Sequence, residues 1–307
     1  MNDMITTENN TTPAICYGEI LWDVLPDGPQ PGGAPLNVAY HLNKMGVATS
    51  LISKVGDDDN GRKLEKLLDK WGIRRHLLQK DKEYPTSQVI AKMNNGNEVS
   101  YDIVFPVAWD FISYSDSIAR QLVPSTYFIY GSLSSRNEPS RKTLLEILES
   151  DVIKVFDINM RPPHIGKDLL GDLLTKADIV KFNQAELEMT QFLFGSPSYS
   201  EAAQVKFIQD RFNIPEVIIT KGEFGASYYI NDKAYHAWGS EVKVVDTIGS
   251  GDSFLAAFLA GHYMQEEPQV ILKNAIAMGG FIATKKGGCP DYQLKDYRDF
   301  RDKIFNT

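Results

Sequence analysis

The stretch Val244-Val245-Asp246-Thr247-Ile248-Gly249-Ser250-Gly251-Asp252-Ser253-Phe254 carries the strongest local signal in this sequence of 307 residues. The valines indicate a β-run, the glycines favour a tight turn, and the apolar run Leu255 to Gly261 predicts a helix. Because the first N–H groups of a helix have no partner within it, this helix start can bind an anion. Asp252, at the rim of the turn, is either a helix cap or a reactive carboxylate.

Other phosphate-binding motifs do not fit the sequence. A dinucleotide fingerprint needs a third glycine where Phe254 stands, and no GxxxxGK[ST] motif of a P-loop occurs. No HExxH motif and no Cys/His cluster indicates a zinc site. These exclusions leave two interpretations of the glycine-rich turn, a plain helix start or a phosphate site of another class.

The composition is typical of a soluble globular protein, with 43% hydrophobic residues and a formal net charge of −8. Acidic and basic residues are interspersed, without the basic patch that nucleic-acid binding requires. Cys16 and Cys289 lie far apart without CxxC spacing, as expected for two reduced thiols. The polar stretch from Met1 to Thr12 does not resemble a signal peptide, and no apolar run is long enough to span a bilayer. We therefore expect a cytoplasmic protein.

Strands and helices are expected to alternate along most of the chain, which predicts a mostly parallel sheet covered on both faces. The expected strands are Ala14–Gly18, Ser50–Val55, Tyr127–Tyr130, Val152–Asp157, Ile179–Phe182 and Val217–Thr220. The expected helices are Leu36–Met45, Gly61–Trp71, Ser140–Glu149, Ala185–Phe194, Glu201–Phe212, Asp252–Met264 and Gln269–Lys285.

Three segments interrupt this alternation. Gln88–Met93 and Glu98–Phe105 alternate apolar and polar residues around Asn94-Asn95-Gly96-Asn97, which predicts a projecting β-hairpin. Ala226–Ile230 and Ala234–Ala237 predict a second hairpin. The segment Leu21–Pro35 is so rich in Pro and Gly that it is expected to form a loop.

With these segments in view, Asp246 to Asp252 resembles the C-terminal signature DTxGAGD of the PfkB-type, ribokinase-like carbohydrate kinases. Ser250 replaces the usual Ala and keeps a small residue where only backbone amides are needed. Gly32-Gly33-Ala34-Pro35-Leu36-Asn37-Val38-Ala39 resembles the sugar-binding signature. Further matches, in family order from about residue 14 to 290, are Val55-Gly56-Asp57-Asp58 with Gly61, Asp157-Ile158-Asn159-Met160-Arg161, Asn183-Gln184-Ala185-Glu186, and Thr220-Lys221-Gly222 with Gly225.

The resemblance implies a role for each matching position around the reaction. Asp252 would be the base that accepts the proton of the attacking sugar hydroxyl. The backbone amides of Gly249, Ser250 and Gly251 would form the anion hole for the transferred phosphoryl group. The cofactors implied are ATP and Mg²⁺, with K⁺ as an additional ion near Asp246.

The resemblance also assigns residues to ATP and metal. Glu186 and Asn183 would organise Mg²⁺, often through water; an isolated Glu at this position could instead serve only its helix start. The nucleotide is expected to contact Lys181, Asn183, Thr220, Lys221, Gly222, Gly225 and Asn274. Lys221 alone could equally be a solvated surface lysine.

The sugar side has its own matching positions, which are Asp23, Gly32, Gly33, Asn37 and Arg161. Carboxylates and amides suit vicinal hydroxyls because they form paired hydrogen bonds. Asp23 could instead be a turn residue, and Arg161 could form an exposed ion pair. Arg161 could also recognise the carboxylate of a keto-acid sugar.

The substrate expected from the resemblance is fructose. The segment Gly32–Asn37 and the opening Gly18-Glu19-Ile20-Leu21-Trp22-Asp23 look more like fructokinases than ribokinases, which tend to carry GGKGAN. A 2-keto-3-deoxygluconate kinase and a ribokinase stay open, as does a catalytically silent sugar-binding regulator. A dehydrogenase with a dinucleotide-binding fold is remote because the fingerprint fails.

The architecture expected is α/β, ribokinase-like, with a small β-sheet lid. Residues 1–12 would form a disordered tail, and residues 13–307 a single kinase domain whose lid comprises about 20–31 and 86–106. The lid would exclude water from the reaction. The resemblance also predicts a homodimer through the lid sheet. The apolar residues available for pairing are Val89, Ala91, Val99, Tyr101 and Ile103. No nucleic-acid or membrane partner is expected.

Overall fold

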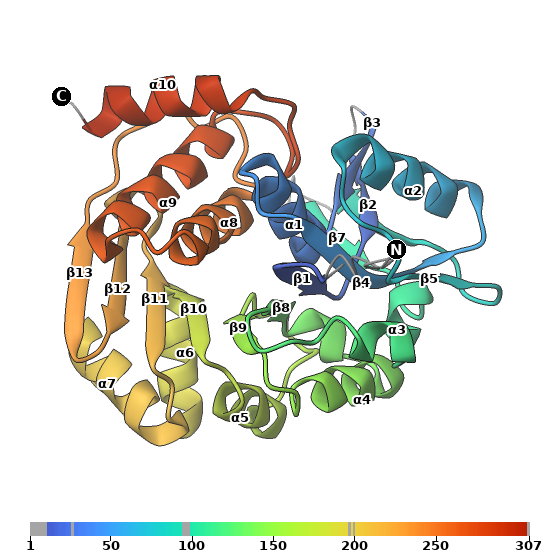
Figure 1. Cartoon of the computed structure of the whole chain (residues 1–307), viewed down its shortest axis with the longest axis horizontal. Helices are drawn as coiled ribbons and strands as arrows, with labels where there is room; N and C mark the ends of the chain where they lie inside the picture. Colours follow the sequence, from blue (N-terminus) through green and yellow to red (C-terminus); the bar gives the residue numbers. More distant parts are fainter. Residues whose placement is uncertain (1–10, 26–27, 94–98, 196–197, 199, 306–307) are drawn as a thin grey trace, which may run out of the picture.

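The computed structural model describes residues 11–25, 28–93, 99–195, 198 and 200–305, with the side chains of 91–93 and 99–102 left out. Most of the tail expected over residues 1–12 lies outside this range, as does the turn expected at 94–97. Within the range, the chain forms one large sheet, a smaller second sheet and helices on both faces of the large sheet (Figure 1).

The large sheet has nine strands in the order β13-β12-β11-β10-β9-β8-β1-β4-β5. The strands from β11 to β5 pair in parallel, whereas β12 and β13 form an antiparallel hairpin at one edge. Their bounds are β1 Ala14–Tyr17, β4 Thr49–Gly56, β5 Leu78–Asp81, β8 Tyr127–Gly131, β9 Ile153–Asp157, β10 Ile179–Asn183, β11 Glu216–Thr220, β12 Ala226–Ile230 and β13 Lys233–Ala237.

Helices cover both faces of this sheet, as the parallel pairing requires. One face packs against α1 Ala34–Lys44, α2 Asp59–Trp71, α8 Ser250–Tyr263, α9 Pro268–Ala283 and α10 Leu294–Phe305 (Figure 1). The other face packs against α3 Asp116–Ala119, α4 Glu138–Ile147, α5 Lys167–Thr175, α6 Gln184–Phe194 and α7 Glu201–Phe212. Short 3-10 helices η1 Ala108–Phe111, η2 Leu133–Ser135 and η3 Gly222–Phe224 complete the chain.

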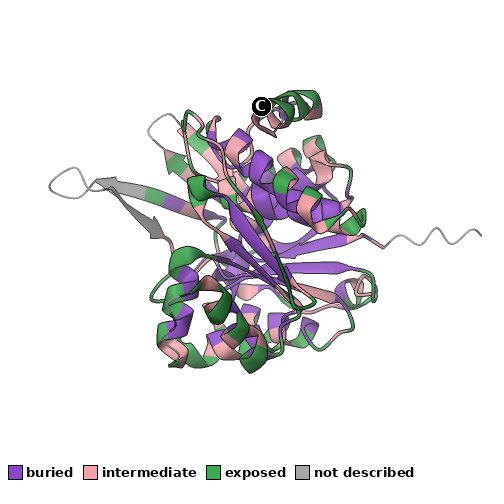
Figure 2. Ribbon diagram, turned by 90° about the vertical axis from the view of Figure 1, so that its left-hand side faces the viewer, coloured by how far each residue is buried: buried purple, intermediate pink, exposed green. Residues whose placement is uncertain are grey.

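The strand alternation explains why the sheet has two apolar cores. Ala14 and Cys16 of β1 face the core under α1, α8 and α9, whereas Ile15 and Tyr17 face the core over α4 and α5. Successive side chains of a strand point to opposite faces, so a continuous apolar run serves both layers. Figure 2 shows buried residues along the central strands and on the inner sides of the helices, with exposed residues outside.

The second sheet contains four strands in the order β3-β2-β6-β7, namely β2 Leu21–Leu25, β3 Gly28–Gly32, β6 Ser87–Met93 and β7 Val99–Ile103. The expected hairpin is confirmed as β6 and β7. The expectation of a loop over Leu21–Pro35 was wrong, because most of this segment forms β2 and β3 and its end begins α1. Pro29 and Pro31 are tolerated because β3 is the edge strand, where a missing N–H leaves no ladder bond unmade.

The structure differs from the sequence-based expectation at four further segments. Val244 and Val245, expected to end a β-run, have no strand partner, and Val245 instead donates its N–H to Ala283 O at 2.8 Å. Helices α5 and α10 and strand β5 were not anticipated. No helix in the described part of the chain has the length and hydrophobicity that a membrane span requires.

Candidate active site

Most residues singled out in the sequence gather at the carboxyl ends of the parallel strands of the large sheet. Asp157, Asn183 and Thr220 are the last residues of β9, β10 and β11, and Glu19 follows directly after β1 and Gly18. In parallel strands these carboxyl ends lie at the same edge, and Asn183 is the register partner of Thr220. Ligands of open α/β sheets bind outside this edge.

The start of α8 supplies backbone N–H groups beside this edge. Gly249 has a φ of 74°, and a Cβ there would lie 2.5 Å from the Cα of Gly288, so the turn needs glycine. Ser250 donates its N–H to Thr247 O at 3.2 Å. Within the described residues, the N–H groups of Gly249, Gly251 and Asp252 have no partner and can receive an anion.

Asp252 lies in the first turn of α8 and meets the segment matched to sugar binding. Asn37, which is buried in α1, donates from Nδ2 to Oδ2 of Asp252 at 2.7 Å. Burial, reinforced by the negative charge of Asp157, raises the pKa of Asp252 to about 6, while the Asn37 hydrogen bond opposes the rise. Two segments 215 residues apart in the chain therefore converge on one carboxylate.

A buried ion pair lies beside this carboxylate. Lys181 Nζ is 2.8 and 2.9 Å from the two carboxylate oxygens of Asp157, and the side chains are only 7% and 6% exposed. The pair forms because Lys181 and Asp157 are register partners on adjacent strands. Although burial opposes the charge, Asp157 and Glu186 raise the pKa of Lys181, so its ammonium stays charged. A Cβ added to Gly251 would lie 3.6 Å from this ammonium, which places Lys181 at the helix start.

Glu186 and Asn183 form a capping box at the start of α6. Asn183 Oδ1 accepts the N–H of Glu186 at 2.9 Å, and Glu186 Oε2 accepts the N–H of Asn183 at 2.8 Å. Glu186 Oε1 accepts the N–H of Met160 at 2.9 Å. Each carboxylate oxygen offers two acceptor sites, so one on each is left for a metal-bound water. The pair therefore fits a magnesium site of the water-mediated kind, and it also serves the helix start.

Asp246 joins two loops around the start of α8. Its Oδ1 accepts the N–H of Ile248 at 3.0 Å, and its Oδ2 accepts the N–H of Gly287 at 2.9 Å. Both oxygens thus have backbone partners, which fixes the loop that leads into Gly249. In the described part of the chain, Asp246 forms no hydrogen bond with Asn183 or Glu186.

The sugar side is formed by the base of the small sheet and the start of α1. A Cβ at Gly32 would lie 2.2 Å from Oδ2 of Asp23, so only glycine admits this carboxylate. Burial, with Asp246 as the second cause, raises the pKa of Asp23 to about 6. Gly33 has a φ of 109°, and a Cβ there would lie 2.4 Å from Glu19 O. Both glycines are therefore required for close approach.

Arg161 and Glu19 are two further ionisable side chains near Asp252. Arg161 is exposed and donates to Met160 O at 3.3 Å, and its charge lowers the pKa of both Asp252 and Glu19. Glu19 is 3% exposed, and burial raises its pKa to about 7. Its Oε2 has no hydrogen-bond partner within the described residues. An exposed Arg161 is free to turn toward an anionic group.

The region matched to the nucleotide lies at the ends of β11 and β12. Lys221 Nζ is held by Ser227 Oγ at 2.6 Å and by Glu201 at 3.2 Å, so it is a tethered lysine rather than a freely solvated one. A Cβ at Gly225 would lie 2.8 Å from the backbone of Trp238, whose side chain is 80% exposed. Thr220 donates from Oγ1 to Phe182 O at 3.3 Å, and Gly222, with a φ of 57°, opens η3.

Asn274 does not join these residues. It lies in α9 and donates from Nδ2 to Oε2 of Glu266 at 3.1 Å. Glu266 lies against Gly261, near the C-terminal end of α8 and away from Gly249. The nucleotide contact expected at Asn274 stays a prediction that this geometry does not support.

Sequence reasoning missed four residues that surround Asp252. Asp157 is the last residue of β9 and Glu19 follows β1, positions that could have singled them out. Gly288 and Cys289 belong to the loop between α9 and α10, where no motif stood out. A Cβ at Gly288 would lie 2.7 Å from Asn37 Nδ2, and Cys289 Sγ lies 3.2 Å from Asn37 Oδ1.

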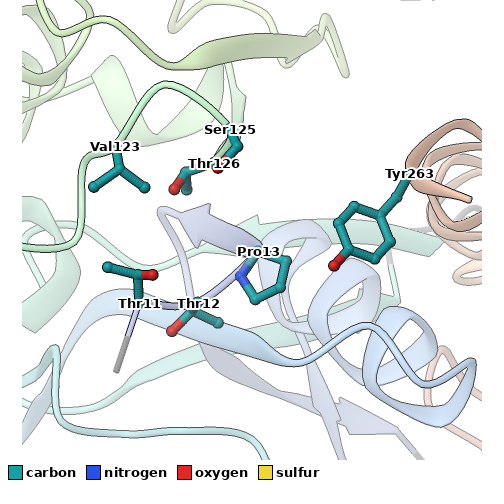
Figure 3. Close-up of a pocket in the computed structure, with 7 residues that line it drawn as sticks. All are labelled: Thr11, Thr12, Pro13, Val123, Ser125, Thr126 and Tyr263. Atoms are coloured by element: carbon teal, nitrogen blue, oxygen red, sulfur yellow. The ribbon is translucent and has the colours of Figure 1, made fainter. Parts of the chain in front are cut away.

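A cavity at the amino ends of the strands is a poor candidate for an active site. The cavity has a volume of about 90 Å³. Figure 3 shows the residues that line it, which are Thr11, Thr12, Pro13, Val123, Ser125, Thr126 and Tyr263. Thr12, Pro13 and Thr126 precede β1 and β8, so the cavity lies at their amino ends. Its lining has no charged side chain, whereas the opposite edge gathers Asp157, Lys181 and Asp252.

Comparison with known proteins agrees with this geometry. Residues 18–294 match the family model described as pfkB family carbohydrate kinase. The fructokinase-2 of Solanum lycopersicum is 28% identical over 307 residues, covering 90% of this chain and 92% of the relative. The fructokinase-1 of Zea mays is 27% identical over 305 residues, covering 90% and 93%.

Solved structures share the fold. A Vibrio cholerae O395 fructokinase with bound fructose, ADP and calcium ion has a TM-score of 0.78 and 24% identity, covering 94% of this chain and 98% of that one. A Xylella fastidiosa fructokinase with bound ATP has a TM-score of 0.81 and 20% identity, covering 95% and 99%. These similarities confirm the ribokinase-like α/β fold expected from the sequence. The chain therefore belongs to the pfkB family of carbohydrate kinases and is an ATP-dependent sugar kinase.

Proposed function

We propose that this sugar kinase is a fructokinase, transferring the γ-phosphoryl group of ATP to fructose to give fructose 6-phosphate. The observation that carries the proposal is the contact between Asn37, from the sugar-binding segment, and Asp252, beside unpartnered N–H groups at the start of α8. The relatives named as fructokinases, matched over nine-tenths of the chain, support fructose as the sugar.

Asp252 is proposed as the base. As the hydroxyl oxygen of the sugar bonds to the γ-phosphorus, its proton passes to the Asp252 carboxylate, and the bond from that phosphorus to the β–γ bridging oxygen breaks to release ADP. A pKa of about 6 keeps Asp252 largely ionised at neutral pH while making it a better proton acceptor than an ordinary aspartate. Its second oxygen, which has no contact to Asn37, is the one left for the sugar hydroxyl.

The charge that develops on the transferred group needs donors fixed before the reaction. The unpartnered N–H groups of Gly249 and Gly251 provide backbone donors, and Lys181 adds a buried positive charge beside them. Because these groups are held by the helix and by Asp157, little reorganisation is needed. Arg161 is proposed to turn toward the sugar or the transferring phosphate.

The metal ions stay part of the proposal. Glu186 and Asn183 would hold Mg²⁺ through water, and the ion would neutralise the phosphate oxygens of ATP. Potassium is proposed near the Asp246 loop, in line with a Vibrio cholerae fructokinase double mutant solved with bound potassium ion. In this chain Asp246 holds the N–H groups of Ile248 and Gly287, so its contribution would be to shape that loop.

The nucleotide is proposed to lie over η3. Gly222 and Gly225 allow the backbone to turn there, and Lys221 is fixed nearby by Ser227. The exposed rings of Phe224 and Trp238, with 63% and 80% of their surface accessible, offer apolar faces to a purine. Thr220, at the end of β11, is proposed to contact the nucleotide as well, whereas Asn274 lies near the C-terminal end of α8 and is left out of this set.

The small sheet, with residues of about 20–31 and 86–106, is proposed as a lid belonging to a single kinase domain. Its face bearing Leu21, Asp23 and Val89 is largely covered, and Asp23 presents its carboxylate toward Gly32. Closure of this face over a sugar would exclude water and limit hydrolysis of ATP. Asp23 would then accept hydroxyl groups of the sugar.

The opposite face of the lid supports a proposed homodimer. Val24 and Ile90 are register partners on β2 and β6, and they are 36% and 38% exposed. Val89, one of the residues expected to pair with a second subunit, is instead buried on the inner face. Sedimentation of the wild type and of a Val24→Asp variant tests the dimer, which should dissociate in the variant.

We place the protein in the cytoplasm, since Cys16 and Cys289 are free thiols.

The test is sugar-dependent ADP formation from ATP and Mg²⁺ with a panel of fructose, ribose, tagatose, adenosine and 2-keto-3-deoxygluconate. A fructokinase should turn over fructose with the highest kcat/KM. A preference for the keto-acid would assign Arg161 to carboxylate recognition and replace fructose as the substrate. If a sugar binds without release of ADP, the protein is a sugar-binding regulator.

A further inference from the structure

Cys289 makes a contact that the reaction described above does not use. It follows Gly288 in the loop between α9 and α10 and is partly buried. Its Sγ lies 3.2 Å from Oδ1 of Asn37, whose Nδ2 lies 2.7 Å from Oδ2 of Asp252. The three side chains form a continuous line from this loop to the proposed base.

The direction of each hydrogen bond follows from chemistry. Asp252 is ionised at neutral pH and can only accept, so the end of Asn37 that meets it must be the NH₂ group. The carbonyl oxygen of Asn37 then faces Cys289. Burial raises the pKa of the Cys289 thiol well above its ordinary value, with the charges of Asp252 and Asp23 adding to the rise. The thiol therefore keeps its hydrogen and can donate it to Asn37.

The backbone around Cys289 is held in place independently. The Asn37 amide packs against Gly288, where a Cβ would lie 2.7 Å from Nδ2. Gly288 O is 2.9 Å from Nε2 of His41, and Nδ1 of His41 is 3.0 Å from the hydroxyl of Tyr292. This buried network fixes the loop against α1, so Sγ of Cys289 is presented at a constant position.

We propose that Cys289 is a positioning residue for the phosphoryl transfer: its S–H holds the Asn37 amide in the one orientation that donates to Asp252. Without this donor, the amide can rotate by half a turn and present its oxygen to the carboxylate, which repels it. The inference rests on the proposed role of Asp252 as the base. Cys289 itself touches neither the sugar nor ATP in this scheme.

The test compares three substitutions that separate the donor from the volume. Cys289→Ser keeps a donor, Cys289→Val fills the space without one, and Cys289→Ala removes both. Valine and alanine should lower kcat/KM for the sugar about 3- to 10-fold, the range that one hydrogen bond supports, with the KM for ATP unchanged. Serine should stay within about threefold of the wild type because the O–H replaces the S–H.

A double-mutant cycle adds a readout that a packing role would not move. In an Asn37→Ala background, Cys289→Val should cause less than about a twofold further loss, because the group it positions is gone. The unfolding temperature of every variant is measured alongside.

Two results would overturn the inference while leaving the kinase intact. One is that kcat/KM for the sugar falls as far in Cys289→Ser as in Cys289→Val. The other is that Cys289→Ala and Cys289→Val keep the kcat/KM of the wild type. Asp252→Asn is measured in parallel. A fully active Asp252→Asn variant would refute the proposed base, whereas the two results above refute only the role of Cys289.

Discussion

Two separate variants of the buried Lys181–Asp157 pair, Lys181→Met and Asp157→Asn, should move the acidic limb of the pH–rate profile in opposite directions. Lys181→Met keeps an unbranched side chain, shorter than lysine by the terminal nitrogen, and removes its charge. The proposed base must be ionised to accept a proton, so activity is lost as the pH falls through the pKa of Asp252, about 6 in the wild type. Lys181 lowers that pKa and Asp157 raises it. The limb should therefore move above pH 6 in Lys181→Met and below it in Asp157→Asn.

The same substitutions have a cost in stability that the structure sets. Both side chains are less than a tenth exposed, at 7% and 6%, so Lys181→Met leaves the Asp157 carboxylate buried without its partner. Breaking one partner of a buried ion pair costs about 3–5 kcal/mol. For a chain of this size each kcal/mol lowers Tm by about 2 °C, so Tm should fall by about 6–10 °C. The double variant Lys181→Met/Asp157→Asn should recover much of this loss, because no uncompensated charge remains.

The assay is kcat/KM for fructose at saturating ATP between pH 5 and 9, with Tm measured by differential scanning fluorimetry in the same buffers. Lys206→Met is the control, since Lys206 forms an exposed pair with Asp210 within α7 and its change should leave the limb in place. Limbs that move in the same direction, or that both stay at the wild-type position, would refute the electrostatic account of Asp252.

Three further substitutions test other parts of the account. Arg136→Met should lower stability by about 3–5 kcal/mol and raise the KM for the sugar, measured by urea unfolding and steady-state kinetics, because the buried Arg136 pairs with Asp110 and holds two carbonyls at the base of β7. Trp238→Ala should raise the KM for ATP several-fold and leave that for the sugar unchanged; equal effects on both would contradict the placement of the purine. Gly288→Ala should lower kcat/KM for the sugar about tenfold, because its Cβ would displace the buried Asn37 amide.

Much of the fold could be predicted because its central strands are short segments rich in apolar residues that alternate with helices along the chain. The strands β1, β4, β8, β9, β10 and β11 follow this pattern, since each is buried on both faces. The composition of the segment Leu21–Pro35 predicts a loop because Pro and Gly dominate it, yet the edge strand β3 pairs with β2 and accommodates Pro29 and Pro31. The local composition cannot reveal that a neighbouring strand is available.

In the candidate site, too, residues within one local motif could be predicted, whereas contacts between distant segments could not. Asp252 and the glycines before it stand in one local motif, so their place at a helix start could be predicted. The partner of Lys181 depends on β9 and β10 being adjacent in register, which the sequence does not state. The contact of Cys289 with Asn37 joins residues 252 positions apart and involves no motif at the cysteine. Contacts of this kind depend on how the loop after α9 packs against α1.

The most direct test of the central claim is fructose-dependent ADP formation by Asp252→Asn, with fructose binding measured by calorimetry on the same preparation. We expect kcat to fall by about 10²–10⁴-fold while fructose still binds, because asparagine keeps the shape of the side chain and cannot accept the proton. The exposed Asp291→Asn serves as the matched control and should behave as the wild type. Retention of kcat within a few-fold of the wild type in Asp252→Asn would contradict the account.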